Sequence, residues 1–249
     1  MSRPSTWHSE FCLAFETSSP WGSVALGRGP ELIDARRFSA PMRHAVEFLG
    51  TVEAMCRTYD VSPAAVSRIY VSSGPGSFTG LRIGITAARM IAFARRVASG
   101  ADVHLVAVPT LSVIAHNALH SIDPPRHVAV ILDAKRSRVY AARFVRNGDT
   151  YVAEREAAEV EPTGFLASQT RDTAIMGEGV HQHRAAVEQS GLMILPESLY
   201  APRAETVFEL GITLAGAGRF VDPRQLIPTY IRAPEAEEKW SRKHGGTMA

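Results

Sequence analysis

Short apolar runs separated by turn residues dominate the N-terminal part of the chain. The runs Phe11 to Glu16, Ser23 to Leu26 and Leu32 to Phe38 are bounded by residues such as Pro, Gly and Ser. Because the connections between them are short, the pattern predicts three strands in an antiparallel meander.

The next segment, from about Met42 to Tyr59, has a helical pattern of apolar positions. One stripe steps by four and three through Ala45, Leu49, Val52, Cys56 and Tyr59. Phe48 and Met55 widen this stripe to the side. A stripe of that width predicts a helix that covers a sheet and leaves apolar surface for a neighbour.

A further strand and helix are joined by a glycine turn. The run Arg68 to Ser72 predicts the strand, and either Ser77 or Thr79 is a candidate N-cap for the helix. Exposed N–H groups at such a turn favour an anion, so Gly74, Gly76 and Ser77 are candidates for holding a phosphate. No Lys follows Gly80, and the glycine spacing departs from the dinucleotide fingerprint, so a tight structural connection remains the alternative.

The helix that follows, Phe78 to Ala98, has apolar or small residues on nearly every side. Arg82, Arg89 and Arg96 lie seven residues apart and form one narrow strip. A helix without a broad polar face has to be covered on more than one side. It either lies deep within the subunit or has a partner on its second face, and the arginines would then meet acids, RNA phosphates or solvent.

The same order of elements recurs in the second half of the chain. After a strand at His104 to Val108 and a helix from Thr110, the expected elements are strands at 128–133, 139–146 and 150–156, a helix from Glu161, a strand at 173–176, and a turn at 177–179 into a helix near Val180. Two such halves would face each other across a cleft with a glycine turn on each wall. A last helix, Ala204 to Arg219, has Gly211, Ala215 and Gly218 on one face, which suits close packing.

Composition narrows the class of protein. The chain has 249 residues and a net charge of +2, so it has no composition typical of a large nucleic-acid surface. Two cysteines, Cys12 and Cys56, fit a reducing compartment better than a disulfide scaffold. Neither a signal peptide nor a membrane-length apolar run is present, so we expect a soluble cytoplasmic protein without a membrane partner.

Candidate catalytic groups are sparse. Glu16 and Asp133 each end the first strand of a half. They are either cleft carboxylates or caps that accept from the amides of Thr17 and Ala134 in the turns that follow, and the capping role is favoured. His116 and His120 are spaced like a metal pair but lack an evident third ligand, so we interpret them as residues of a helix surface.

Four stretches of the chain resemble the TsaB (YeaZ) family, whose members are paralogues of the TsaD/Kae1 threonylcarbamoyl transferases. They are LAFETSSPWGSVAL at 13–26, SGPGSFTGLRIG at 73–84, LDAKRSRVYAARF at 132–144 and PTYIRAPEAEEKW at 228–240. The resemblance implies an α/β protein of the actin-like ATPase (ASKHA, ribonuclease H-like) fold with two similar βββαβα subdomains. These would comprise residues 11–106 and 107–203, with the helix 204–219 packing back on the first and a mobile tail at 233–249.

The same resemblance implies a role in tRNA threonylcarbamoyladenosine (t6A) biosynthesis. The chain would be a non-catalytic subunit that binds and activates TsaD together with TsaE, pairs with itself when TsaD is absent, and meets tRNA only through the complex. It implies no catalytic residue, no metal and no cofactor beyond weak ATP or ADP binding at the partner interface, with Gly74, Gly76 and Ser77 as a vestigial phosphate loop. The interface expected from the helix pair comprises Phe48, Leu49, Val52, Met55, Arg82, Ile85, Arg89 and Ile91.

Departures from the related enzymes support this expectation. Thr110 and Ile114 stand where TsaD-type enzymes have the two histidines that bind a metal, and Glu16 replaces the usual Asp of phosphotransferases with this fold. Two alternatives remain: a nucleotide-dependent phosphoryl or carbamoyl transferase that uses its own cleft, and a metallopeptidase. The second is disfavoured because no H-E-x-x-H motif occurs.

Overall fold

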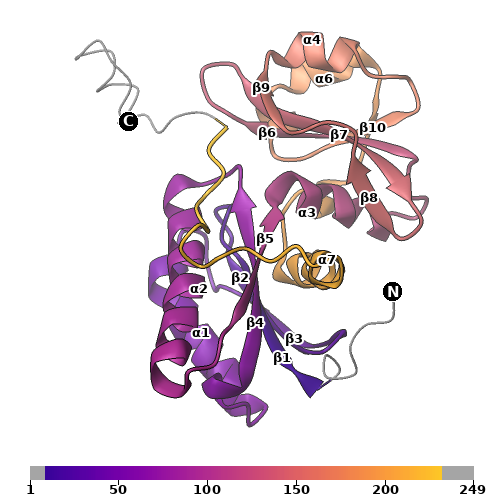
Figure 1. Ribbon diagram of the computed structural model, residues 1–249. Helices are drawn as coiled ribbons and strands as arrows, with labels where there is room; N and C mark the ends of the chain where they lie inside the picture. The colour runs from indigo at the N-terminus through magenta and orange to yellow at the C-terminus, as the bar shows by residue number, and fades with distance from the viewer. Residues whose placement is uncertain (1–8, 232–249) are drawn as a thin grey trace.

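The computed structural model describes residues 9–231, which form two lobes, each built around one mixed β-sheet (Figure 1). Sheet A has the strand order β3-β2-β1-β4-β5. Its strands are β1 (Phe11–Glu16), β2 (Ser23–Arg28), β3 (Glu31–Arg37), β4 (Val66–Gly74) and β5 (His104–Pro109). The first three pair antiparallel, which confirms the predicted meander, while β4 and β5 run parallel to β1.

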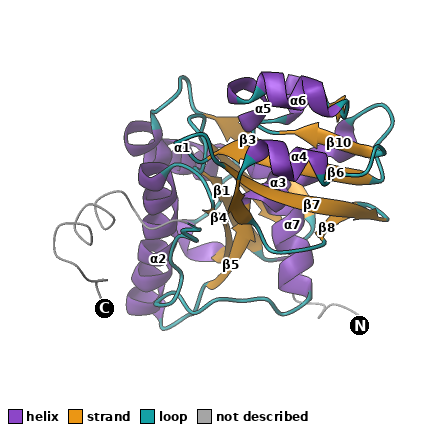
Figure 2. Cartoon of the chain, turned by 90° about the horizontal axis from the view of Figure 1, so that it is seen from above, coloured by secondary structure: helices purple, strands orange, loops and turns teal. Residues whose placement is uncertain are grey.

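Helices cover both faces of sheet A. Helices α1 (His44–Thr58) and α2 (Phe78–Ser99) lie on one face, and α7 (Ala204–Gly216) lies on the other (Figures 1 and 2). This explains why β1 and β4 are almost wholly buried runs, since a strand covered on both faces has no polar side. The Ser77 hydroxyl caps the start of α2, and Gly100, with a positive φ, ends it.

Sheet B repeats the arrangement of sheet A. Its order is β11-β10-β6-β7-β8, so the second-half strands take the same neighbours and directions as those of the first half. The strands are β6 (His127–Asp133), β7 (Val139–Asn147), β8 (Thr150–Ala153), β9 (Ala158–Val160), β10 (Thr173–Met176) and β11 (Met193–Ile194). Gly74 is the last residue of β4 and Gly177 comes directly after the equivalent strand β10, and both have positive φ angles, 112° and 106°.

The helices of the second lobe are short. They are α4 (Pro162–Ala167), α5 (Gly179–Gln182) and α6 (Arg184–Ser190), and α3 (Thr110–Asn117) lies between the two sheets. The sequence did not indicate β9 or β11, and β8 ends before the predicted 156. Both missed strands have three residues or fewer, too few for a period to be recognised.

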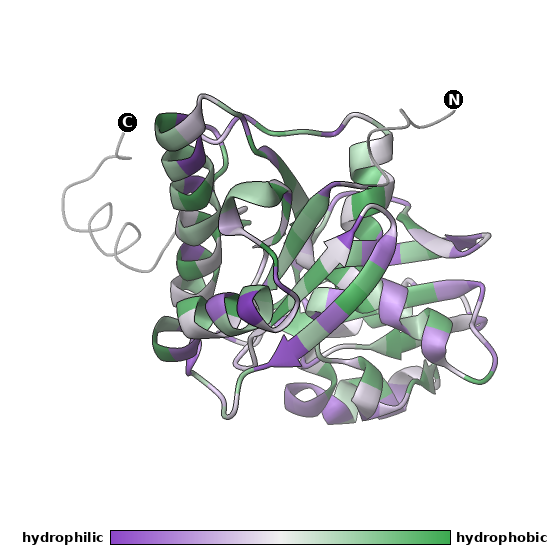
Figure 3. Cartoon of the chain, turned by 90° about the horizontal axis from the view of Figure 1, so that it is seen from below, coloured by the Kyte–Doolittle hydropathy of each residue, from purple (hydrophilic) through white to green (hydrophobic). Residues whose placement is uncertain are grey.

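The buried side chains form three clusters that follow this layering. One fills the second lobe, one lies between sheet A and helices α1 and α2, and one lies between sheet A and α7. Hydropathy colouring shows hydrophobic stretches along the strands, and helices in which hydrophobic and hydrophilic positions alternate (Figure 3). Gly211 allows α7 to approach Tyr70 closely, whereas Gly218 has open space where a side chain would lie.

The chain returns from α7 to α2 as an extended strap, residues 217–231. Val221 pairs with Leu105 at the free edge of β5, and Leu226 is buried in the α1/α2 core. The Thr229 N–H then donates to the Ser73 carbonyl oxygen, and the Tyr230 ring stacks on Phe78. The strap thus covers the edge of sheet A and reaches the first turn of α2. The tail expected at 233–249 lies outside the described residues.

Within residues 9–231, no helix is long and apolar enough to cross a membrane.

Candidate functional site

The outer face of α2 exposes a row of large apolar side chains. Met90, Phe93 and Val97 have exposed fractions of 57%, 62% and 70%. Arg82 and Arg89 are also exposed, and helical periodicity places them along one side of this row. Such a concentration of exposed apolar groups on one element is typical of a surface that another protein covers.

The outward side of α1 is also apolar. Val46 and Leu49 are about two-thirds exposed, at 68% and 67%, and Met42 lies just before the helix with the same exposure as Val46. Because α1 and α2 contact each other on the same side of sheet A, their outer sides contribute to one surface of the lobe. We call this surface the α1/α2 face: Met42, Val46, Leu49, Arg82, Arg89, Met90, Phe93 and Val97.

Three residues of the expected interface are not on this face. Phe48, Met55 and Ile85 are at most 2% exposed and belong to the core between the helices and sheet A. Phe48 packs edge-on against Phe15 of β1, with ring centroids 4.8 Å apart. The sheet therefore uses these residues, and they are not available to a partner.

Of the other expected interface residues, Leu49, Arg82 and Arg89 are exposed, and Val52 and Ile91 are half-buried against the core. Sequence reasoning missed Met42, Val46, Met90, Phe93 and Val97 as surface residues. The signal was present as the second apolar side of each helix, but periodicity does not reveal which side faces the sheet.

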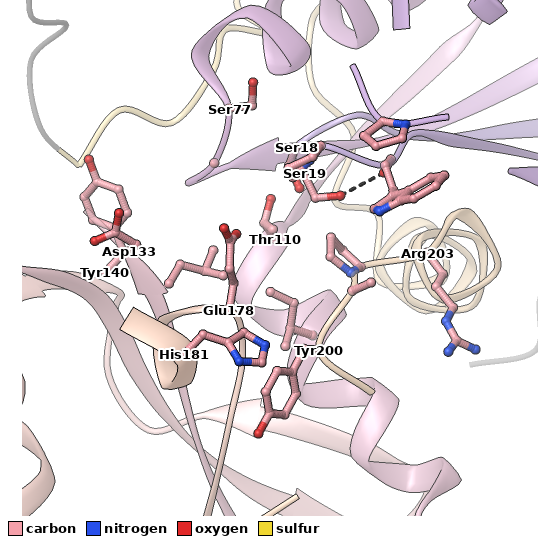
Figure 4. Close-up of a pocket in the computed structure, with 18 of the residues that line it drawn as sticks. Ser18, Ser19, Ser77, Thr110, Asp133, Tyr140, Glu178, His181, Tyr200 and Arg203 are labelled. Atoms are coloured by element: carbon pink, nitrogen blue, oxygen red, sulfur yellow. Dashed lines mark hydrogen bonds between the residues drawn. The ribbon is translucent and has the colours of Figure 1, made fainter. Parts of the chain in front are cut away.

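A cleft of about 1500 Å³ separates the lobes. Its first-lobe wall carries Ser18, Ser19, Ser77 and Thr110, and its second-lobe wall carries Asp133, Tyr140, Glu178 and His181 (Figure 4). Both glycine turns border it, as the predicted repeat of elements implied. Acidic and basic side chains both line the walls, so the cleft has no strong preference for one sign of charge.

The glycine turn before α2 is packed against the turn after β1. Ser77 N–H donates to the Ser18 carbonyl oxygen (2.6 Å), and Gly74 N–H donates to the Thr110 hydroxyl (3.2 Å). A side chain at Gly76 would overlap the backbone of Ser18. These contacts favour a packing role for the turn, and phosphate binding by Gly74, Gly76 and Ser77 stays a prediction.

Glu16 caps the turn after β1 from a fully buried position. Its Oε1 accepts from the Ser18 N–H (2.5 Å) and the Ser18 hydroxyl (2.6 Å), while Oε2 has no hydrogen-bond partner in the described residues. Burial raises the pKa of the Glu16 carboxyl, although the Ser18 hydrogen bonds oppose this shift. The group therefore stabilises a turn, and the N–H it uses belongs to Ser18 rather than to Thr17 as expected.

Asp133 occupies the equivalent position in the second lobe. Its Oδ1 accepts from the Lys135 N–H (3.1 Å), again two residues on rather than at Ala134. The next residues, Lys135, Arg136 and Ser137, all have φ angles between 52° and 62°, which side chains rarely adopt. Asp133 thus caps a tight turn that places Lys135 and Arg136 on the wall of the cleft.

Comparison with known proteins gives one consistent answer. The family described as "TsaD: tRNA N6-adenosine threonylcarbamoyltransferase" matches residues 39–240 of the chain. The chain belongs to this family.

Within the TsaD family, it is a TsaB (YeaZ) member. It is 28% identical over 234 residues to the tRNA threonylcarbamoyladenosine biosynthesis protein TsaB of Bacillus subtilis, covering 92% of this chain and 96% of that one. The TsaB of Escherichia coli is 28% identical over 232 residues, covering 91% and 96%. The structure of YeaZ from Pseudomonas aeruginosa matches with a TM-score of 0.77 at 26% identity, covering 89% of this chain and 99% of that one. The expected actin-like ATPase fold is confirmed.

Thr110 and Ile114, which the sequence comparison with TsaD-type enzymes was expected to match to metal histidines, both take part in packing. Thr110 is 1% exposed and accepts the Gly74 N–H, and Ile114 belongs to the core of the second lobe. His116 is buried, with Nε2 3.5 Å from Glu209, so it is not the surface histidine that was expected. Among residues 9–231, no group of three His, Cys, Asp or Glu side chains is arranged to hold a metal ion. Both cysteines are buried and free.

Proposed function

We propose that the chain acts in t6A biosynthesis as a non-catalytic subunit that binds the TsaD transferase and works together with TsaE. Its relatives from B. subtilis and E. coli are named as threonylcarbamoyladenosine biosynthesis proteins, and they match it over nearly their whole length. The observation that carries the proposal is the exposed α1/α2 face.

The chemistry of the face suits a stable protein partner. Covering Met90, Phe93, Val97 and their neighbours removes large apolar side chains from water, which drives association. Arg82 and Arg89 beside them orient a partner that carries acidic groups opposite. A second copy of the chain would use the same face about a two-fold axis when TsaD is absent.

A separate set of contacts supports the non-catalytic part of the proposal. Glu16 is turned into a buried cap, and Thr110 and Ile114 cannot ligate a metal as imidazoles do. In the glycine turn, the N–H groups of Ser77 and Gly74 already donate to Ser18 and Thr110, so they are not free to bind a phosphate. Transfer chemistry would then belong to TsaD.

The binding surface is tested by Met90→Asp and Phe93→Asp. Both side chains point away from the core, so the variants should fold, and each should reduce binding to a TsaD protein by at least tenfold, because an unpaired charge would be buried at the interface. Complex formation is measured by size-exclusion chromatography with light scattering and by calorimetry.

The matched control is Met193→Asp, which changes a methionine of similar exposure, 53% against 57%, in the second lobe. It should bind TsaD as the parent does. Normal binding by both Met90→Asp and Phe93→Asp would contradict the assignment of the face.

The activating role has its own assay. TsaD supplied with its threonylcarbamoyl donor, TsaE and tRNA should modify adenosine at many turnovers only when this chain is present, and the chain alone should modify none. Full multi-turnover modification without it would disprove the proposal even if binding occurs.

A further inference from the structure

Helix α3 belongs to both lobes. Its Leu111, Ile114 and Ala115 are part of the second-lobe core, while Val113 packs into the core beneath α7. The chain crosses between the lobes twice, once just after α3 and once at residues 199–203, before α7 begins. Any change in the angle between the lobes therefore has to pass through these two crossings.

The side chain of Asn117, the last residue of α3, links the two crossings between the lobes. Asn117 is 1% exposed, and its Nδ2 donates to the carbonyl oxygens of Leu199 (3.0 Å) and Ala201 (2.9 Å). Its Oδ1 accepts from the Thr206 hydroxyl of α7 (2.7 Å). Two carbonyl partners and one hydroxyl partner define which end of the amide carries nitrogen.

The three hydrogen bonds of Asn117 connect different parts of the molecule. Leu199 is part of the second-lobe core, Ala201 lies in the crossing segment, and Thr206 is on the helix that packs against sheet A. A further bond, from the Ala204 N–H to the Ser23 hydroxyl (3.0 Å), ties the end of the crossing to the start of β2.

We propose that Asn117, Thr206 and the carbonyls of Leu199 and Ala201 form a hinge latch that holds the two lobes at one angle. Rotation about the crossings would separate Asn117 from at least one partner and leave buried polar groups without hydrogen bonds. The latch gives the cleft a fixed width, and it makes the molecule a rigid support for the surfaces on both lobes.

The latch is tested by measuring the distance between the lobes in the full-length protein. Spin labels on cysteines introduced at Glu31 and Gln189, which are exposed and lie on different lobes, report this distance by double electron–electron resonance. The native cysteines are buried. The parent should give one narrow distance distribution.

Two variants break the latch without emptying its space. Asn117→Asp is nearly isosteric but faces the two carbonyl oxygens with a carboxylate, so the distribution should broaden or gain a second peak. Thr206→Val removes only the hydroxyl that donates to Oδ1 and should broaden it less.

A matched control separates hinge locking from ordinary stability. Thr173→Val removes a buried hydroxyl that bonds Thr170 within the second lobe, so it should lower stability and leave the distance distribution unchanged. A broad distribution in the parent would overturn the proposal. An unchanged distribution in Asn117→Asp, with a stability loss like that of Thr173→Val, would also overturn it. Asn117 would then stabilise the fold through its hydrogen bonds without fixing the angle between the lobes.

Discussion

The Glu16 carboxyl is fully buried at the end of β1. Two bonds from Ser18 hold one oxygen, and burial raises the pKa of the group above 4.5, its ordinary value. The unfolded chain thus binds this proton less readily than the folded protein does. Stability contributed by Glu16 is complete below pH 4.5 and is lost as the pH rises through the folded-state pKa.

Glu16→Gln should therefore gain stability relative to the parent as the pH increases from about 4.5. The amide keeps an oxygen for the Ser18 N–H, and any cost of placing NH₂ where Oε2 lies does not vary with pH. Urea unfolding of both proteins between pH 4.5 and 8 measures the difference. A difference that stays constant over this range would contradict the buried, proton-binding role.

Glu47→Gln provides a comparison with the opposite sign. Hydrogen bonds from the Ser39 hydroxyl and N–H, and then from Arg43, lower the pKa of Glu47 to about 2. Its stabilising effect is present above pH 4.5 and disappears as the pH falls towards 2, so the deficit of this variant should shrink over that lower range.

At the scale of an element, two glycines of helix α2 allow it to pack closely against the turn after β1. A side chain at Gly80 would overlap the carbonyl oxygen of Thr17, and one at Gly84 would overlap the Thr17 hydroxyl. These glycines let α2 lie directly on the turn after β1. The opposite side of the helix then points outward, where it forms the α1/α2 face.

Gly80→Ala should lower the free energy of unfolding by about 1–3 kcal/mol, since neither backbone can move away without disturbing the other. Gly50→Ala is the matched control, because Gly50 lies inside α1 with no atom within 4 Å of a new side chain. That change should raise stability by up to about 1 kcal/mol through helix propensity. Equal effects of the two changes in urea unfolding would contradict the close packing of α2 on Thr17.

Element prediction succeeded where the local pattern was long. The sequence predicted β1, α1, α2 and β6 because each has several periods of apolar residues or a clear turn at its ends. The sequence wrongly placed Phe48, Met55 and Ile85 on the partner-binding side of α1 and α2, whereas they face the sheet. When a helix is apolar on nearly every side, its periodicity does not show which side faces inward.

At the scale of the whole molecule, the cleft between the lobes is large, but two of the turns that line it are hydrogen-bonded to each other. One hydrogen bond, from the Ser77 N–H to the Ser18 carbonyl oxygen, joins the turn after β1 to the glycine turn before α2. The cleft lining is mixed in charge, since Lys135, Arg136, Glu178 and Glu197 all contribute to it. These features favour weak or no nucleotide binding by the chain alone.

Calorimetric titration of the chain with ADP and Mg²⁺ should thus give no saturable heat at micromolar concentrations. The same titration on the complex with TsaD tests binding at the partner interface separately. Micromolar binding to the chain alone, weakened by Lys135→Ala, would instead support the transferase alternative that uses the cleft.

The sequence by itself determined the order of the longer elements, the internal repeat and the family, because these depend on local periodicity, turn residues and motifs such as SGPGSFTGLRIG. Only the tertiary structure decided which sides of α1 and α2 remain exposed, that Glu16 is buried and that Asn117 joins the two crossings. Those properties depend on contacts between residues far apart in the chain. Local pattern carries no information about such contacts until the sheets and helices are packed.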